Sequence, residues 1–186
     1  MKNSPLWLRR LAFVAALIAL VAMVPATSVQ SQDVAVGQAT ATVLAVLSVT
    51  ASQALNFGNV YQGVAKTQDE TSDANSGIFA ITGQASADVS CFFQLPDYVA
   101  LADGSDRMVI TFSTTDATYA PLAGATPSVP GVGATLNTNP RNLTGTSLGA
   151  AGGAQIFLGG KVIPSVNQAA GAYSADIVLT VAYTGT

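Results

Sequence analysis

The sequence predicts an all-β protein, an antiparallel β-sandwich of immunoglobulin-like type with about seven to nine strands. Short stretches of alternating apolar and polar residues recur along the chain, and Gly, Pro, Asn and Asp separate them. No helical periodicity occurs after residue 28, although a signal-peptide helix is expected before it. A closed barrel is the alternative architecture.

Residues 171–183 form the clearest predicted strand. One face carries Tyr173, Ala175, Ile177, Leu179, Val181 and Tyr183, and the other carries Ser174, Asp176, Val178, Thr180 and Ala182. Successive side chains of a strand point to opposite faces, so this alternation predicts a strand with one side in a core. Gly171 supplies a turn before it.

Residues 1–28 have the proportions of a secretory signal peptide. Lys2, Arg9 and Arg10 form a basic start, and an apolar stretch of about 14 residues precedes Pro25. A membrane-spanning helix needs roughly 20 such residues, so an uncleaved anchor is the less favoured alternative. We expect cleavage after Ala26 or Ser28, export by the general secretory pathway, and an extracellular or cell-surface location.

The chain that remains after cleavage is acidic. It holds four basic residues, Lys66, Arg107, Arg141 and Lys161, against ten acidic residues, a net charge of −6. No basic stripe is present, which argues against nucleic acid as a partner. Its length suffices for one domain with its own core, which we place at residues 44–186, behind an N-terminal extension at residues 29–43.

The first strand of the domain is expected in Gln38–Ala51. Ala and Val alternate there with Thr and Ser, although Leu44 and Val46 interrupt the polar face. Because an average strand has about five or six residues, this stretch is interpreted as one unusually long strand or two consecutive ones. Leu55 to Val60 follows, with Phe57 as a core anchor and Gly58 at a turn or bulge.

Further short strands are expected at 77–83, 88–95, 107–113, 154–158 and 161–164, with a short segment after Val99. Gly159 and Gly160 are expected to form a tight hairpin turn between the last two strands. The polar stretch 67–76 is interpreted as an exposed loop. Residues 114–152 contain four prolines and little alternation, which predicts long connections with one short strand near 135–137.

The residue types argue against most enzyme chemistry. The chain has no histidine, which removes the common general bases, the Ser-His and Cys-His nucleophiles and the histidine metal ligands. Cys91 is the sole cysteine and is expected to be buried beside Val89 and Phe93. Acidic residues at 69–73 and 103–106 match no calcium-ligand spacing. We therefore expect no catalytic residue, cofactor, metal or small-molecule substrate.

Several motifs carry a resemblance to a known family. They are Leu55-Asn-Phe-Gly58, Ile156-Phe-Leu-Gly-Gly160, Ala170-Gly-Ala-Tyr-Ser174 and Val181-Ala-Tyr183. In this order, over residues 38–184, they resemble the secreted bacterial domain-of-unknown-function 4402 family, which is similar to spore coat protein U and to archaic chaperone–usher pilins. The sequence departs from the spore coat U pattern where a paired cysteine is replaced by Ser48.

The resemblance implies a pilin-like sandwich that lacks one strand and receives it from a neighbour. Leu55, Phe57, Gly58, Gly159, Gly171, Tyr173 and Tyr183 would be its motif and core residues. The candidate donor residues are Val34, Val36, Ala39, Ala41 and Val43. A homopolymer joined through this N-terminal strand would be expected, with a secretion or assembly chaperone as a further partner.

Two functions are therefore expected. The first is a non-enzymatic structural subunit of an extracellular filament, such as a pilus or fimbria, or of a surface layer. The alternative is a monomeric secreted binding module or adhesin that uses loops within residues 114–152. The sequence alone leaves open whether residues 29–43 pair within their own domain or with another copy.

Overall fold

The computed structural model describes residue 35, residues 37–124, 130–131 and 133–184, and the predicted signal peptide lies outside these residues. The described residues from 42 to 184 form one compact unit. The described residues include strands and turns, and no helix among them is long and apolar enough to cross a membrane. The predicted all-β class is confirmed.

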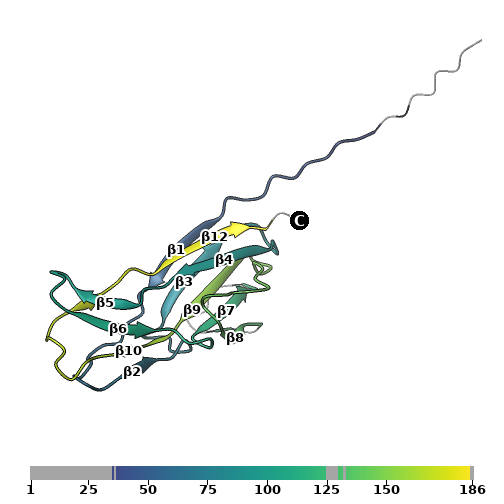
Figure 1. Ribbon diagram of the computed structural model, residues 1–186. Coiled ribbons are helices and arrows are strands. Elements are labelled where there is room, and N and C mark those ends of the chain that lie inside the picture. Colours follow the sequence, from purple (N-terminus) through teal and green to yellow (C-terminus); the bar gives the residue numbers. More distant parts are fainter. Residues whose placement is uncertain (1–34, 36, 125–129, 132, 185–186) are drawn as a thin grey trace, which may run out of the picture. The chain divides into compact units, whose positions relative to one another are not determined.

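Twelve strands occur in the described part of the chain, more than the sequence predicts (Figure 1). They are β1 (Ser48–Gln53), β2 (Lys66–Gln68), β3 (Gly77–Thr82), β4 (Val89–Gln94), β5 (Tyr98–Leu101), β6 (Arg107–Thr111), β7 (Ala117–Leu122), β8 (Thr135–Thr138), β9 (Gly153–Leu158), β10 (Gly160–Ile163), β11 (Tyr173–Ser174) and β12 (Val178–Tyr183).

The strands form antiparallel sheets. The first sheet has the order β1-β3-β9-β7-β8, and the second sheet has the order β11-β5-β6-β10-β2. A separate ladder joins β12 to β4 along its whole length, from Val178–Gln94 to Tyr183–Val89. Two isolated bridges connect β4 and its preceding turn to the later chain, Cys91 with Leu143 and Asp88 with Ser147. The arrangement is consistent with a β-sandwich.

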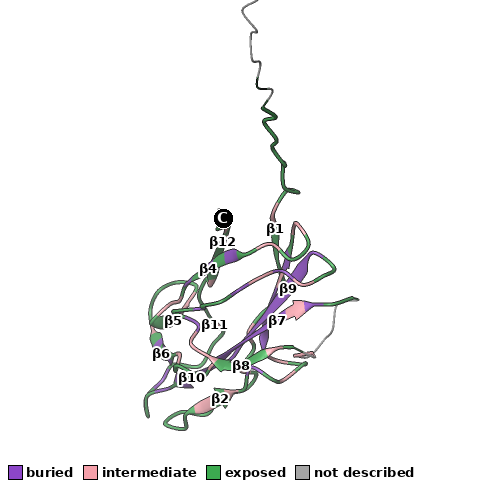
Figure 2. Cartoon of the chain, turned by 90° about the vertical axis from the view of Figure 1, so that its right-hand side faces the viewer, coloured by how far each residue is buried: buried purple, intermediate pink, exposed green. Residues whose placement is uncertain are grey.

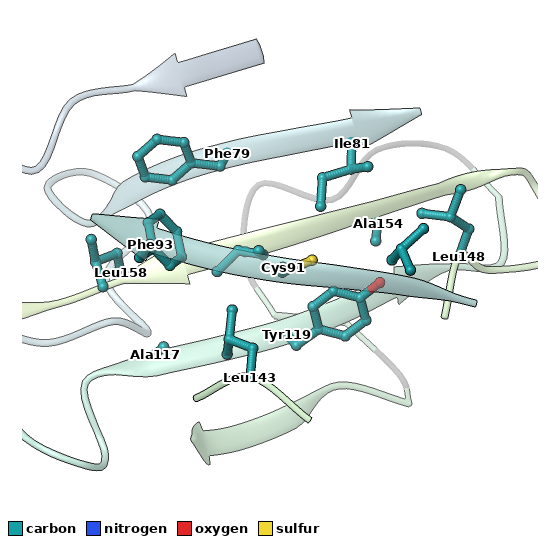
Figure 3. Packing of buried hydrophobic residues seen from close by; sticks show 12 residues of the cluster. Phe79, Ile81, Cys91, Phe93, Ala117, Tyr119, Leu143, Leu148, Ala154 and Leu158 are labelled. Atoms are coloured by element: carbon teal, nitrogen blue, oxygen red, sulfur yellow. The ribbon is translucent and has the colours of Figure 1, made fainter. Parts of the chain in front are cut away.

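The main core lies between the first sheet and β4 (Figure 3). Its buried members are Phe79, Ile81, Val89, Cys91, Phe93, Ala117, Tyr119, Leu143, Leu148, Ala154, Ile156 and Leu158. Phe79 of β3 and Phe93 of β4 meet edge to face with their ring centroids 5.0 Å apart, a favoured aromatic geometry. Cys91 is buried beside Val89 and Phe93, as predicted, and burial raises the pKa of its thiol.

The predicted hairpin turn at Gly159 and Gly160 is wrong. β9 pairs with β3 and β7 in the first sheet, whereas β10 pairs with β6 and β2 in the second. The chain therefore passes from one sheet to the other at Gly159. A Cβ atom there would lie 2.5 Å from Gln68 O and 2.7 Å from Glu70 N, so the crossing requires glycine.

The interpretation of residues 114–152 as long connections with one short strand missed a second strand, β7. β7 lies between β9 and β8, and five of its six residues are buried (Figure 2). Both faces of β7 are covered, so its sequence shows no alternation. Pro121 lies beyond Tyr119, the last β7 residue paired with β8, where a missing N–H is tolerated. The expected strand near 135–137 is β8.

Two strand boundaries differ from the predictions. Residues 37–47 contain no strand, so the stretch predicted at Gln38–Ala51 begins only at Ser48. The predicted strand at 171–183 is divided into β11 and β12, although its alternation is observed: Tyr173, Ile177 and Leu179 are half-buried while Ser174 and Val178 are exposed. The loop 67–76 is not fully exposed either, because Glu70 and Ser76 are buried.

Candidate functional site

An apolar cleft of about 900 Å³ is the candidate site. Residues 54–62, which follow β1, form one side, and residues 168–175 with Ile177, which precede and include β11, form the other. The inner face of the second sheet forms its floor. The cleft therefore lies between the chain segments that continue from two edge strands, β1 and β12.

The floor of the cleft is made by four side chains of the second sheet. They are Val99, Met108, Ile110 and Val162, each at most 9% exposed. Phe57, Val60 and Tyr173 pack against them from the two sides and remain only partly buried. The cover over this part of the sheet thus comes mainly from the loop after β1, whereas strands β3, β4, β7 and β9 supply most of the main core.

The loop after β1 directs Phe57 into the cleft. Gly58 N donates to Asn56 Oδ1 at 2.8 Å, and Gly58 has a φ of +58°, a conformation that glycine adopts at little cost. Lys66 Nζ donates to Asn59 O at 3.0 Å and holds the following residues against β2. This local chemistry accounts for the Leu-Asn-Phe-Gly motif: the turn fixes the direction of the aromatic ring.

Strands with free edges lie in the cleft wall and beside it: β11 lines the cleft, and β1 and β12 adjoin its two sides. β1 and β11 are terminal strands of their sheets, and β12 pairs only with β4 in the described part of the chain. β1 and β12 are close neighbours in Figure 1, yet no ladder joins them. An edge strand presents backbone N–H and C=O groups that another strand can pair with.

Hydrogen bonds join the two sides at one end of the cleft. The side-chain amide of Gln62 donates to the carbonyl of Gln168, and Gly63 N donates to Ser165 O at 2.9 Å. At the opposite end of β1, Tyr183 Oη donates to Ala45 O at 2.8 Å and accepts a bond from Gln84 N at 2.7 Å. Hydrogen bonds thus join the flanking segments at both ends of the unpaired gap between β1 and β12, which is called the open side.

Asp106 anchors the segment that carries Gln168. Its Oδ2 accepts from Ala169 N, from Gln168 Nε2 and from the Tyr173 hydroxyl, each at 2.7 Å. The hydrogen bond from Ala169 N, followed by that from Tyr173, lowers the pKa of Asp106. Gln168 is 6% exposed, and its Oε1 accepts from Ser165 N at 3.0 Å.

The motif residues fall into two groups. Leu55, Phe57, Gly58, Gly171 and Tyr173 line the cleft. A Cβ atom on Gly171 would lie 2.6 Å from a methyl group of Leu101, so the chain approaches β5 closely there. Gly159 is at the crossing between sheets, and Tyr183 ties the far end of the open side, so neither contributes to the cleft.

The candidate donor residues are described only in part. Val34 and Val36 lie outside the described residues. Ala39, Ala41 and Val43 belong to no strand, and Val43 is 93% exposed. Val34 and Val36 occupy even positions and the other three occupy odd ones, so a regular strand would need a bulge near Gly37 to point all five the same way.

The acidic residues hold turns together. Asp69 Oδ1 accepts from Thr71 N at 2.8 Å, and Asp103 Oδ1 accepts from Ser105 N at 3.0 Å. The Thr71 hydroxyl also donates to Asp69 Oδ1, and this bond, followed by that from Thr71 N, lowers the pKa of Asp69. The bond from Ser105 N lowers the pKa of Asp103. Among the described residues, no group of three or more acidic or cysteine side chains could hold a metal ion.

Sequence reasoning missed Gln62, Asp106 and Gln168 as parts of this site. Their contacts join residues that are 62 and 106 positions apart, and neither local spacing nor alternation indicates such pairs. The Asp106 turn was the nearest signal, since an acidic residue directly before a strand often accepts backbone hydrogen bonds. No protein-family model, curated protein or solved structure matches this chain, so the cleft is interpreted from its own residues.

Proposed function

We propose that this chain is a non-enzymatic structural subunit of an extracellular filament or surface layer, with a pilin-like, immunoglobulin-like sandwich that a neighbouring copy completes. The observation that carries the proposal is the cleft with an apolar floor between free strand edges. A strand laid there would pair its backbone with an edge and cover Val99, Met108 and Ile110. The resemblance at Leu55–Gly58 and Ala170–Ser174 supports the same function.

The proposed occupant is residues 29–43 of another copy. The sequence Leu44-Ala-Val-Leu47 contains no Gly, Pro, Asn or Asp, the residues that tight reverse turns use. A hairpin that returned residues 29–43 beside β1 of their own domain would need such a turn there. This favours pairing between copies, and export by the general secretory pathway, read from residues 1–28, would place the filament outside the cell.

The alternative is a monomeric binding module that uses loops within residues 114–152. Part of that segment belongs to the folded framework, so fewer residues are candidates for binding a ligand. β7, β8 and the buried residues Leu143 and Leu148 of that segment belong to the framework. The loops that remain between these parts are the candidate binding segments.

Deletion tests the proposal. The chain without residues 1–28 is expected to form filaments in negative-stain electron micrographs, and an unboiled denaturing gel is expected to show a ladder that collapses on boiling. Removal of residues 29–43 should abolish both while the domain stays folded by circular dichroism. Filaments that persist after the deletion would exclude donation by this segment, and a monodisperse monomer of the undeleted chain would favour the binding module.

A further inference from the structure

A chain of hydrogen bonds runs from Asp106 through residues 168–173 to Gln62 on the opposite side of the cleft. Asp106 Oδ2 receives three donors from residues 168–173, and Gln168 O receives the side-chain amide of Gln62. Asp106 itself is fixed by the turn between β5 and β6. Leu101 N donates to Asp106 O at 3.1 Å, and Gly104 N donates to Leu101 O at 2.8 Å. The turn between β5 and β6 is thus linked to one side of the cleft through Asp106, and to the other side through Gln168 and Gln62.

We propose that Asp106 is a positioning residue that, through Gln168 and Gln62, holds the cleft at the width that accepts a strand. This inference rests on the proposed function, since it concerns the same cleft. Without the carboxylate, the Ala169 amide loses its acceptor, and Gln168 Nε2 keeps only Arg107 O and the Tyr173 hydroxyl as partners, so residues 168–170 are held less firmly against β6. The two sides of the cleft then move more freely, and an incoming strand must order them as it binds.

The chemistry of the acceptor explains why a carboxylate is present. Three donors converge on one oxygen, and a negatively charged acceptor makes stronger hydrogen bonds than a neutral one. Tyr173 and Asp103 are the titratable groups near it. Burial, followed by the neighbouring Asp106 and Asp103, raises the pKa of Tyr173. In the described residues, no cationic side chain bonds to Asp106, so its ionisation depends on neutral donors.

The first test is amide hydrogen exchange of the chain without residues 1–28, measured by NMR under conditions that keep it monomeric. Asp106→Ala is expected to increase exchange at Ala169 by about tenfold or more, because that amide loses its acceptor. Asp103→Ala is the matched control, since it removes the same charge from the same turn but contacts only Ser105. Equal protection of Ala169 in the two variants would overturn the inference.

The second test is binding of a fluorescent peptide with the sequence of residues 29–43. Asp106→Ala and Gln62→Ala should each weaken binding several-fold relative to Asp103→Ala, and Asp106→Asn should recover part of the loss. Gln62 is exposed, so its variant is expected to fold even if Asp106→Ala does not. Unchanged affinity in Gln62→Ala would contradict the proposed role of the hydrogen-bond chain.

The pH profile separates positioning from a general structural role. Because hydrogen bonds lower the pKa of Asp106, its contribution is present at neutral pH and is lost as pH falls through that lowered value. In the parent chain, peptide affinity should therefore decrease as the pH falls through this value. In Asp106→Asn, peptide affinity should depend less on pH over the same range. If the peptide binds neither the parent chain nor any variant, the proposed function fails. The exchange rate of the Ala169 amide still decides whether Asp106 positions residues 168–173.

Discussion

The main core and the cleft are both built on antiparallel strands with buried apolar side chains but differ in what covers them. In the core, Phe79 and Ile156 of the first sheet face Phe93 of β4, and all three are at most 7% exposed. In the cleft, the second sheet offers equally buried floor residues, yet partly buried Phe57 and Tyr173 cover them. The difference shows that the sandwich is closed by strands on one part and by loops on the other.

The largest expected effect comes from truncation in the core. Leu158→Ala should lower the free energy of unfolding by about 2–5 kcal/mol, because Leu158 is fully buried and leaves a cavity. Phe57→Ala, made in the cleft, should cost roughly half as much, since its ring is already partly exposed. Urea denaturation of both variants measures the contrast, and an equal loss would mean that the cleft is as closed as the core.

A smaller loss is expected at the crossing between the sheets. Gly159→Ala should destabilise the protein by about 1–3 kcal/mol, because its new methyl group meets backbone atoms of Gln68 and Glu70. Gly124→Ala is the control, since no atom lies within 4 Å of the added Cβ there. Thermal unfolding followed by circular dichroism compares them, and a neutral Gly159→Ala would contradict the close approach.

The hydrogen bonds of the Tyr183 hydroxyl should contribute less to the free energy of unfolding than the close packing at Gly159. Tyr183→Phe removes the hydroxyl that donates to Ala45 O and accepts from Gln84 N, with an expected loss of about 1 kcal/mol. Tyr61→Phe is a control on a side chain that is 75% exposed. Exchange of the Gln84 amide should rise in Tyr183→Phe alone, and an unchanged amide would exclude this tie.

The smallest predicted effect is a gain in thermal stability on replacing Glu70. Burial, with Asp69 and Asp116 nearby, raises the pKa of Glu70, so the folded state binds its proton more tightly than the unfolded chain. Stability from Glu70 is therefore present at low pH and lost as pH rises through the raised value. Glu70→Gln should raise Tm slightly at pH 7 and not at pH 3, whereas exposed Asp73→Asn should not. A lower Tm at pH 7 would contradict this.

The sequence predicts those strands that have one buried and one exposed face. Alternation identifies β4, β6 and β12 because Cys91, Ile110 and Leu179 each follow an exposed residue. It fails for β7, whose two faces are both covered. It also overextends β1, because alternating Ala and Thr at 39–42 provide too little apolar area to require a partner within the described domain.

The candidate site was predictable only through its motifs. The glycines and aromatic residues at 55–58 and 171–173 marked chain turns, and the structure brings both segments to one cleft. The hydrogen bonds among Gln62, Asp106 and Gln168 join three distant loops, and polar residues in loops give no periodic signal. Such contacts follow from the order of strands in the sheets, which cannot be read from the local sequence pattern.

Free strand edges are the feature on which assembly would depend, so hydrogen exchange of the assembled protein tests them most directly. On assembly, amides along the outer edge of β1, and along residues 172–178, should become strongly protected, while amides of β3 and β9 in the main core should change little. Edges that exchange equally fast before and after assembly would contradict the claim that a neighbouring strand fills the cleft.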